Sequence, residues 1–289
     1  MSDASSPRSP EPNPEALSRE DWSDLREAYD ALSHHGLADR LTELLGTPIT
    51  ASIRMLPQPA ENLVHGAVEK ALQKALEVAV ATIDQDHPPA KPRLLTHKAL
   101  AGLAGGVGGA FGLAAVAAEL PVSTVLILRS IADIARSQGE DLSSIEARLA
   151  CLEVFALDGG TPDDKTSKDG TESITDASEI GYFAVRAGMS KHVTDAAKFL
   201  AKGSGELTAP PLLQLIQKIG GRFGIVVSEK MAAQAIPVIG AVGGALINSY
   251  FIDHYQDLAR AHFAIRRLER DHGEATIQAA YATLGDPIT

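Results

Sequence analysis

The sequence contains few of the residues on which several protein classes depend. Cys151 is the only cysteine among 289 residues, which excludes an internal disulfide and a thiolate metal cluster. Aromatic residues make up 4% of the chain, and segments in which β-branched and polar residues alternate are scarce, which disfavours a sheet. Alanine, a strong helix former, is very frequent instead. The composition therefore favours an all-α protein.

Basic residues are in a clear minority. The chain has 26 Lys and Arg against 37 Asp and Glu, a formal net charge of −11, so nucleic acid is not an expected partner. The first 21 residues contain no apolar stretch of the kind that a secretory signal needs. Together with the single cysteine, this leads us to expect a cytoplasmic protein.

The motifs of common catalytic and cofactor sites are also missing. The sequence has no HExxH motif, EF-hand loop, GxSxG elbow or GxxxxGK[ST] loop. The glycine-rich stretch 105–112 departs from GxGxxG, since Phe111 stands where the third glycine belongs. We therefore expect no cofactor and no metal site, and we identify no catalytic residue. This favours a protein that is not an enzyme.

Helical patterns fill the chain from Ser18 to about residue 285. We interpret this region as a single multi-helix bundle that follows a disordered tail at 1–17, with a polar loop at 158–173. Ser18 and Asp21 form a capping-box pattern that predicts a helix start, and Gly46 predicts a helix end. Further helices are expected at 37–45, 61–83, 97–118, 121–137, 142–157, 177–188, 190–201, 212–234, 236–270 and 274–284.

Two long uncharged segments are expected at the centre of the bundle. Residues 99–128 contain one formal charge, Glu119, and residues 231–252 contain none. Glycines spaced four apart place small residues on one helix face, where another helix backbone can approach closely. The glycines expected to form this packing seam are Gly102, Gly106, Gly109, Gly240 and Gly244.

Both segments are long enough to cross a bilayer, which needs about 20 residues. Alanine and glycine dominate them, however, and these residues drive insertion weakly. Basic residues also flank each segment on both sides, so no orientation for a single crossing emerges. We therefore expect a helical fold that associates with a membrane peripherally, and keep an integral hairpin as a weaker reading.

Glu119 is the sharpest candidate for a polar site, because a buried carboxylate needs a partner or a proton. Pro121 predicts a helix break at 119–121. Glu119 would bind a cation or polar ligand there, cap the helix begun by Pro121, or pair with Arg129 or Arg186. Arg129, Asp133 and Arg136 are spaced four and three apart and predict a local ion-pair ladder.

A group of arginines follows the second uncharged segment. Arg260, Arg266 and Arg267 lie close together on the expected last long helix, where they would meet anionic head groups. The alternative is a solvated helix face whose charges are balanced by Asp257, Glu269 and Asp271.

Several short motifs give the chain a resemblance to a known family. They are Glu119-Leu120-Pro121, Arg129 with the following IADIA, Gly139-Glu140-Asp141-Leu142, the stretch from Gly181-Tyr182-Phe183 to Arg186, and AIPVIGAVGGALIN at 235–248. With these motifs the chain resembles the EcsC family from about Gly46 to Tyr281. The resemblance implies an α-helical protein with a recurrent suspicion of membrane association, and it brings no catalytic mechanism.

Two functional hypotheses follow from these observations. The first is a non-catalytic module that binds membrane lipid or a membrane protein, motivated by the uncharged segments and their basic flanks. The second is a soluble enzyme or ligand-binding protein with a pocket at the expected 119–121 break.

Overall fold

The computed structural model describes residues 13–33, 36–46, 49, 58–81, 113–158, 177–203, 206–234 and 240–285. Over these residues the regular elements are α-helices and short 3₁₀ turns, with no strand, which confirms the all-α prediction. The helices are α1 (Arg19–Ser33), α2 (Leu37–Leu45), α4 (Gln58–Ala81), α6 (Leu113–Ser137), α7 (Ile145–Glu153), α8 (Ala177–Ala201), α9 (Pro210–Gln234), α10 (Gly240–His272) and α11 (Glu274–Gly285).

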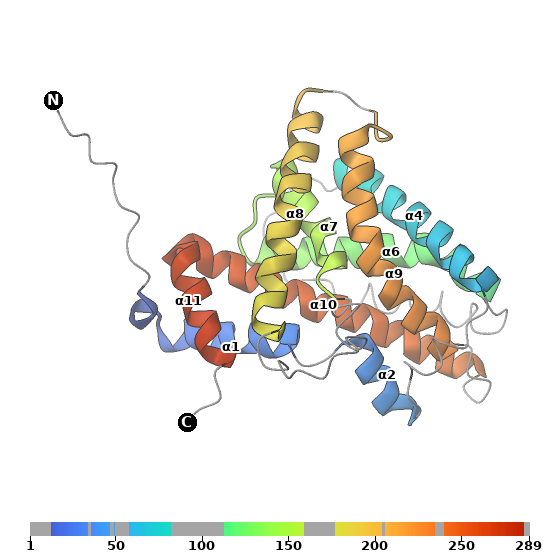
Figure 1. Cartoon of the computed structure of the whole chain (residues 1–289), viewed down its shortest axis with the longest axis horizontal. Helices are drawn as coiled ribbons and strands as arrows, with labels where there is room; N and C mark the ends of the chain where they lie inside the picture. Colours follow the sequence, from blue (N-terminus) through green and yellow to red (C-terminus); the bar gives the residue numbers. More distant parts are fainter. Residues whose placement is uncertain are drawn as a thin grey trace, which may run out of the picture.

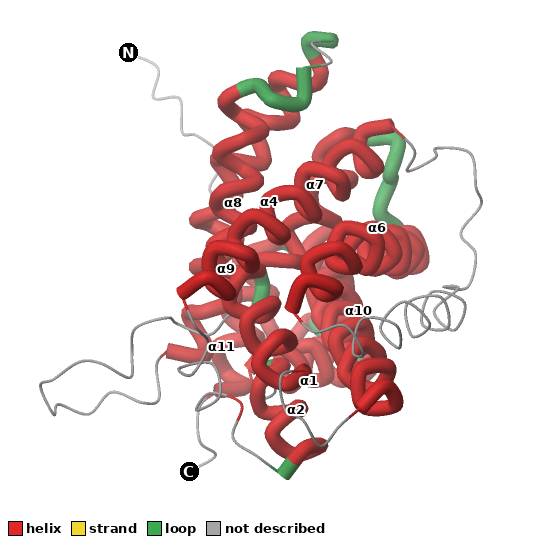
Figure 2. The backbone as a smooth tube through the Cα atoms, turned by 90° about the vertical axis from the view of Figure 1, so that its right-hand side faces the viewer, coloured by secondary structure: helices red, strands yellow, loops and turns green. Residues whose placement is uncertain are grey.

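The 33-residue helix α10 runs the length of the bundle and organises the other helices (Figure 1). It packs against α1, α2, α6, α9 and α11. Helix α4 lies against α6 and α9, and α8 and α9 stand side by side and rise above the rest. The view from the side shows α6 and α10 adjacent to each other (Figure 2).

Two hydrophobic clusters hold these helices together. The larger joins α2, α4, α6, α7, α8, α9 and the first part of α10. The apolar stripe of α4 lies in it, with every member at most 5% exposed: Val64, Val68, Ala71, Leu72, Ala75, Leu76 and Ala79. The smaller cluster packs α1 and α11 against the second part of α10, around Tyr29, Ile265 and Tyr281.

Local capping signals in the sequence appear as predicted. The Ser18 hydroxyl accepts from the Asp21 amide at 3.1 Å, and the Asp21 carboxylate accepts from the Ser18 amide at 3.1 Å. Gly46 ends α2 with φ 63°. Gly139 follows α6 with φ 80°, and the Glu140 amide donates back to the Ala135 carbonyl at 3.0 Å, as in a Schellman motif.

The predicted break at 119–121 is wrong, because α6 runs through Pro121 without interruption. Proline inside a helix costs about 3 kcal/mol. Leu120, Ile127 and Leu128, on both sides of it, are 0% exposed, and burial of each such side chain contributes about 1.5–3 kcal/mol. The burial outweighs the local cost, so the helix continues.

Another predicted boundary differs, since the separate helices expected at 177–188 and 190–201 form one helix, α8. The end predicted for the helix 212–234 is confirmed, because α9 ends at Gln234. The uncharged segment 231–252 is divided between α9 and α10, which begins at Gly240.

Candidate functional site

The Glu119 carboxylate lies in a buried polar cluster formed by three helices. Glu119 comes from α6, Lys230 from the last turns of α9 and Asn248 from the first part of α10. The Lys230 ammonium donates to Glu119 Oε1 at 3.3 Å and to Asn248 Oδ1 at 2.8 Å. The side chains of Glu119 and Lys230 are 6% and 0% exposed. The cluster therefore ties α6, α9 and α10 together inside the core.

The lysine ammonium has partners on several sides. Besides the two oxygen acceptors, it lies 4.5 Å from the centre of the Phe251 ring, a cation–π distance. Burial lowers the pKa of Lys230, and the Glu119 charge partly opposes this. Glu119 Oε2 is buried and accepts no hydrogen bond within the described part of the chain.

This geometry corrects the alternatives considered for Glu119. It does not cap a helix begun at Pro121, because α6 begins at Leu113. Its cationic partner is Lys230, 111 residues away in the sequence, and not Arg129 or Arg186. Lys230 was recognisable from sequence only as a basic flank of the uncharged segment 231–252, and its role as partner is set by how the helices pack.

The other residues predicted to accompany Glu119 lie elsewhere. Arg129 is exposed on α6, and no ion pair joins it to the described residues. Asp133 pairs with Arg136 at 3.1 Å, so one step of the predicted ladder is present. Arg186 on α8 forms two hydrogen bonds with Glu269 on α10, at 2.7 and 2.9 Å.

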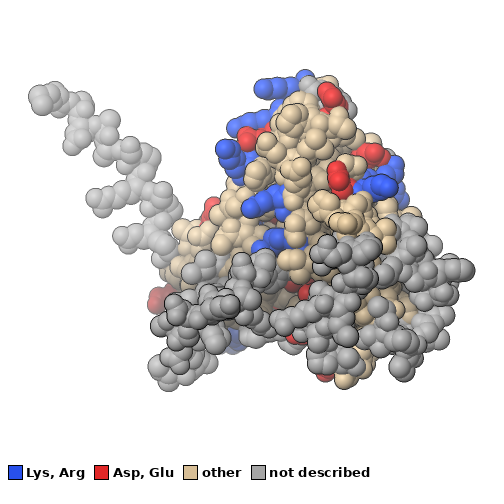
Figure 3. Space-filling view, turned by 45° about the vertical axis from the view of Figure 1, so that its right-hand side comes forward, with Lys and Arg blue, Asp and Glu red and all other residues tan. Residues whose placement is uncertain are grey.

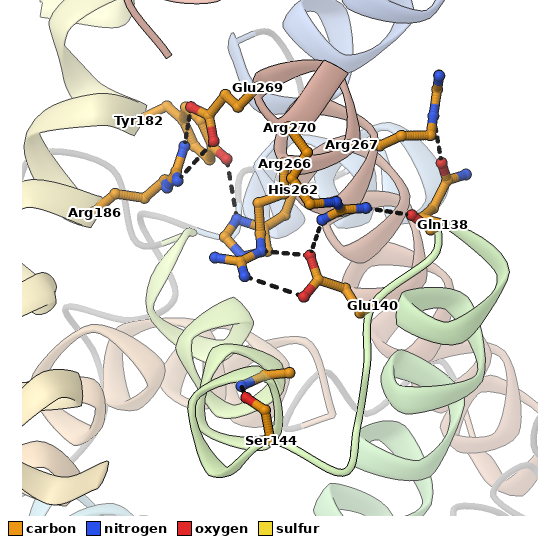
Figure 4. A network of polar contacts seen from close by, with 11 residues as sticks. Gln138, Glu140, Ser144, Tyr182, Arg186, His262, Arg266, Arg267, Glu269 and Arg270 are labelled. Atoms are coloured by element: carbon orange, nitrogen blue, oxygen red, sulfur yellow. Dashed lines mark hydrogen bonds and ion pairs between the residues drawn. The ribbon is translucent and has the colours of Figure 1, made fainter. Parts of the chain in front are cut away.

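A second polar network links the end of α6 to the C-terminal half of α10 (Figure 4). The Glu140 side chain is 5% exposed, and its carboxylate accepts from Arg266 at 2.8 and 3.1 Å and from Arg270. Burial alone would raise the pKa of Glu140, but the two guanidiniums outweigh it and lower the pKa. The Gly139–Leu142 motif thus ends α6 and binds the following turn to α10 through Glu140.

The C-terminal arginines are engaged with carboxylates. Arg260 pairs with Asp257 at 2.5 Å and Arg266 with Glu140. Arg267 bonds to Asp24 of α1 at 2.5 Å and to the Gln138 side chain at 3.1 Å. Of the balancing acids that the sequence suggested, Asp257 contacts Arg260, Asp271 contacts Arg267 at 3.8 Å and Glu269 contacts Arg186. A role of these arginines at an anionic surface stays a prediction.

The buried His262 and Glu153, both near this network, were missed from the sequence. The Tyr182 hydroxyl and His262 Nδ1 are 3.0 Å apart, and burial lowers the pKa of His262 well below its usual value. Glu153 at the end of α7 is 6% exposed, and burial raises its pKa to about 7. No local pattern marks these residues, since their burial depends on α8 and α10.

The predicted glycine seam is only partly within the described residues. Gly102, Gly106 and Gly109 lie outside them, whereas Gly240 begins α10 and Gly244 is buried in it. None of the helices described here combines the length and apolar character needed to cross a membrane. Over the same residues, no group of His, Cys, Asp and Glu side chains is arranged to hold a metal ion.

Comparison with known proteins places the chain at the level of a family. Searches of curated proteins and of solved structures gave no significant match. The family model of the EcsC protein family matches residues 19–268, from the first turn of α1 to near the end of α10. This match covers most of the chain and includes the Glu119–Lys230–Asn248 cluster and the Glu140–Arg266 pair. The chain belongs to the EcsC protein family.

Proposed function

We propose that this EcsC family protein is a non-catalytic module that binds the surface of an anionic membrane. The observation that carries the proposal is a set of exposed apolar side chains at one end of the bundle. Among the described residues, the large hydrophobic side chains that are exposed are Leu63, Val122 and Leu246, at 36%, 55% and 48%.

These residues lie on helices that meet at the same end. The N-terminal parts of α4, α6 and α10 come together at the right of Figure 1, and α6 contacts both other helices. Val122 is three residues after Glu119, and Leu246 is two residues before Asn248. Because both polar residues bind the Lys230 ammonium, one buried cluster joins the two helices that carry these exposed side chains. An apolar surface of this kind suits shallow contact with the acyl boundary of a bilayer.

Exposed positive charge occurs on α6, which carries Val122, and on α8. Arg129 lies seven residues after Val122, on the same side of α6, and is exposed without an ion pair to the described residues. On the face in Figure 3, Lys and Arg side chains gather over the raised part of the molecule that α8 and α9 form. Lys191 and Lys198 of α8 and Lys202, in the turn that follows it, are exposed. Such cations favour anionic lipid even though the net charge is −11.

The alternative function, a ligand pocket at a helix break, has lost the feature that motivated it. Helix α6 is continuous through Glu119, and the Glu119 carboxylate is already paired with the Lys230 ammonium. A buried ion pair that joins three helices is first of all a structural element.

Vesicle flotation tests the proposal. The protein should float with vesicles that contain phosphatidylglycerol, and less with neutral phosphatidylcholine vesicles. Val122→Asp combined with Leu246→Asp should weaken binding about tenfold or more, since it places charge in the apolar contact. Ala275→Asp, at an exposed position on α11, is the matched control and should float like the wild type.

Failure of the wild type to float with either vesicle would refute lipid binding. Equal flotation of the double variant and the control would refute the assignment of the surface. Binding to native membranes but not to protein-free vesicles would assign the surface to a membrane protein instead.

A further inference from the structure

A polar groove lies between α1, α2 and α10, away from the apolar end of the bundle. Its volume is about 450 Å³, within the range of small-molecule sites. Four alanines from α1 and α10 form its apolar part. Its polar lining residues are Asp24, Glu27, Arg40, Gln138, Asp257 and Arg260.

One side of the groove carries two neighbouring guanidinium groups. Asp257 accepts from Arg40 of α2 through Oδ2 at 2.6 Å and from Arg260 through Oδ1 at 2.5 Å. One carboxylate therefore holds two arginines side by side and leaves a net positive charge. Each guanidinium has five N–H donors, and each uses one of its nitrogens in these bonds. The donors that remain suit a ligand with several acceptor oxygens, so they match a phosphate better than they match a single carboxylate.

The α1 side of the groove has the opposite charge. Asp24 is already bonded to Arg267. Glu27, one turn further along α1, is exposed and has no hydrogen bond or ion pair with the described residues. The groove therefore offers an uncompensated carboxylate on one wall and an arginine pair with net positive charge on the other.

We propose that this groove binds a small phosphorylated amine. The phosphate would lie against Arg40 and Arg260, and the ammonium group against Glu27. The same chemistry occurs in free phosphoethanolamine and in the head group of phosphatidylethanolamine. Neither Val122 nor Leu246 lines the groove, so this site goes beyond the membrane surface proposed above and can be tested without vesicles.

Isothermal titration of the full chain with three soluble probes tests the site: phosphoethanolamine, inorganic phosphate and ethanolamine. Phosphoethanolamine should bind saturably in the millimolar range or tighter, and more tightly than either fragment. Arg260→Gln should weaken it about tenfold to a hundredfold, the usual effect of losing a charged hydrogen bond. Arg260→Lys should weaken it less, because it keeps the charge without the fork.

Glu27→Gln separates the two ends of the ligand. It should weaken phosphoethanolamine binding but leave inorganic phosphate binding unchanged. Arg129→Gln removes an exposed arginine outside the groove and should change neither. Both Glu27 and Arg260 are partly or well exposed, so these variants should fold, which their circular dichroism spectra check.

Several results would overturn the proposal. The first is folded wild-type protein that gives no saturable heat with phosphoethanolamine. The second is an affinity for phosphoethanolamine that Arg260→Gln leaves unchanged. The third is a Glu27→Gln variant whose affinities for phosphate and phosphoethanolamine fall equally. The source of the ligand follows from a further comparison. If phosphatidylethanolamine added to vesicles increases flotation and soluble phosphoethanolamine reverses it, the site takes the lipid head group; if flotation does not change, it takes the free molecule.

Discussion

Lys230→Met is the substitution that most directly tests the central polar cluster. Methionine keeps the unbranched apolar stem and removes the ammonium group. The Glu119 carboxylate, whose side chain is 6% exposed, then stays in the core without its cation. Asn248 also loses the hydrogen bond that its Oδ1 accepts at 2.8 Å. The variant therefore leaves the Glu119 carboxylate and the Asn248 amide oxygen buried without the hydrogen bond from Lys230.

The expected loss follows from the burial of both partners. Removing one member of a buried pair costs about 3–5 kcal/mol, mainly because the remaining charge is uncompensated. For a chain of this size that corresponds to a fall in melting temperature of about 10 °C.

Urea unfolding followed by circular dichroism at 222 nm gives the free energies. The double variant Glu119→Gln with Lys230→Met has no charge left in this cluster, and it should recover most of the stability that Lys230→Met loses. Arg129→Gln, an exposed position on α6, is the control and should stay within about 0.5 kcal/mol of the wild type. A Lys230→Met variant as stable as this control would refute the buried pair.

Three other predictions concern single groups. Burial raises the pKa of Glu153 to about 7 from 4.5, so at pH values between these the folded state holds a proton that the unfolded state releases, and the unfolding free energy should fall as the pH rises. Glu153→Gln should reduce this slope in urea titrations across that range, and the slope that is left is expected from Glu229, whose pKa burial raises to about 8. Gly139→Ala should lower the free energy of unfolding by about 1–2 kcal/mol, because φ at this position is 80°. Gly188→Ala, in open space within α8, should raise the free energy of unfolding by up to about 1 kcal/mol. Thermal unfolding measures both changes. Burial raises the pKa of Cys151 to about 12, so iodoacetamide should label it at neutral pH only after unfolding, as read by mass spectrometry; rapid labelling of the native protein would contradict this.

Features that depend on neighbouring residues were predictable from the sequence. The Ser18–Asp21 capping box and the helix ends at Gly46 and Gly139 each need only a few consecutive residues. The buried stripe of α4 follows from its helical periodicity. In these places local preference and tertiary packing favour the same conformation, so the sequence pattern is sufficient.

Features that depend on packing were not predictable in the same way. Pro121 and Gly188 disfavour helix locally, yet α6 and α8 continue through both residues because the surrounding side chains pack. The partner of Glu119 was not predictable for the same reason. Several cations were compatible with the sequence, and only the approach of α9 to α6 selects Lys230 over the nearer Arg129.

The position of the buried pair connects the core to the proposed membrane surface. Helices α6 and α10 carry the exposed Val122 and Leu246, and both are bonded to the Lys230 ammonium close to those residues. A buried polar contact restricts how two helices can slide past each other, because a shift leaves its groups unpaired. We therefore expect the double variant Glu119→Gln with Lys230→Met to recover its stability but to bind anionic vesicles more weakly than the wild type.

Stability and vesicle affinity must be measured on the same protein preparation to separate these effects. Ala275→Asp provides the control for flotation and Arg129→Gln the control for unfolding. Wild-type vesicle affinity in a double variant of wild-type stability would mean that apolar packing alone positions the two exposed side chains. Weaker binding at equal stability would instead assign the pair a positioning role beyond that of the apolar packing, because a shift between the helices would leave its polar groups unpaired.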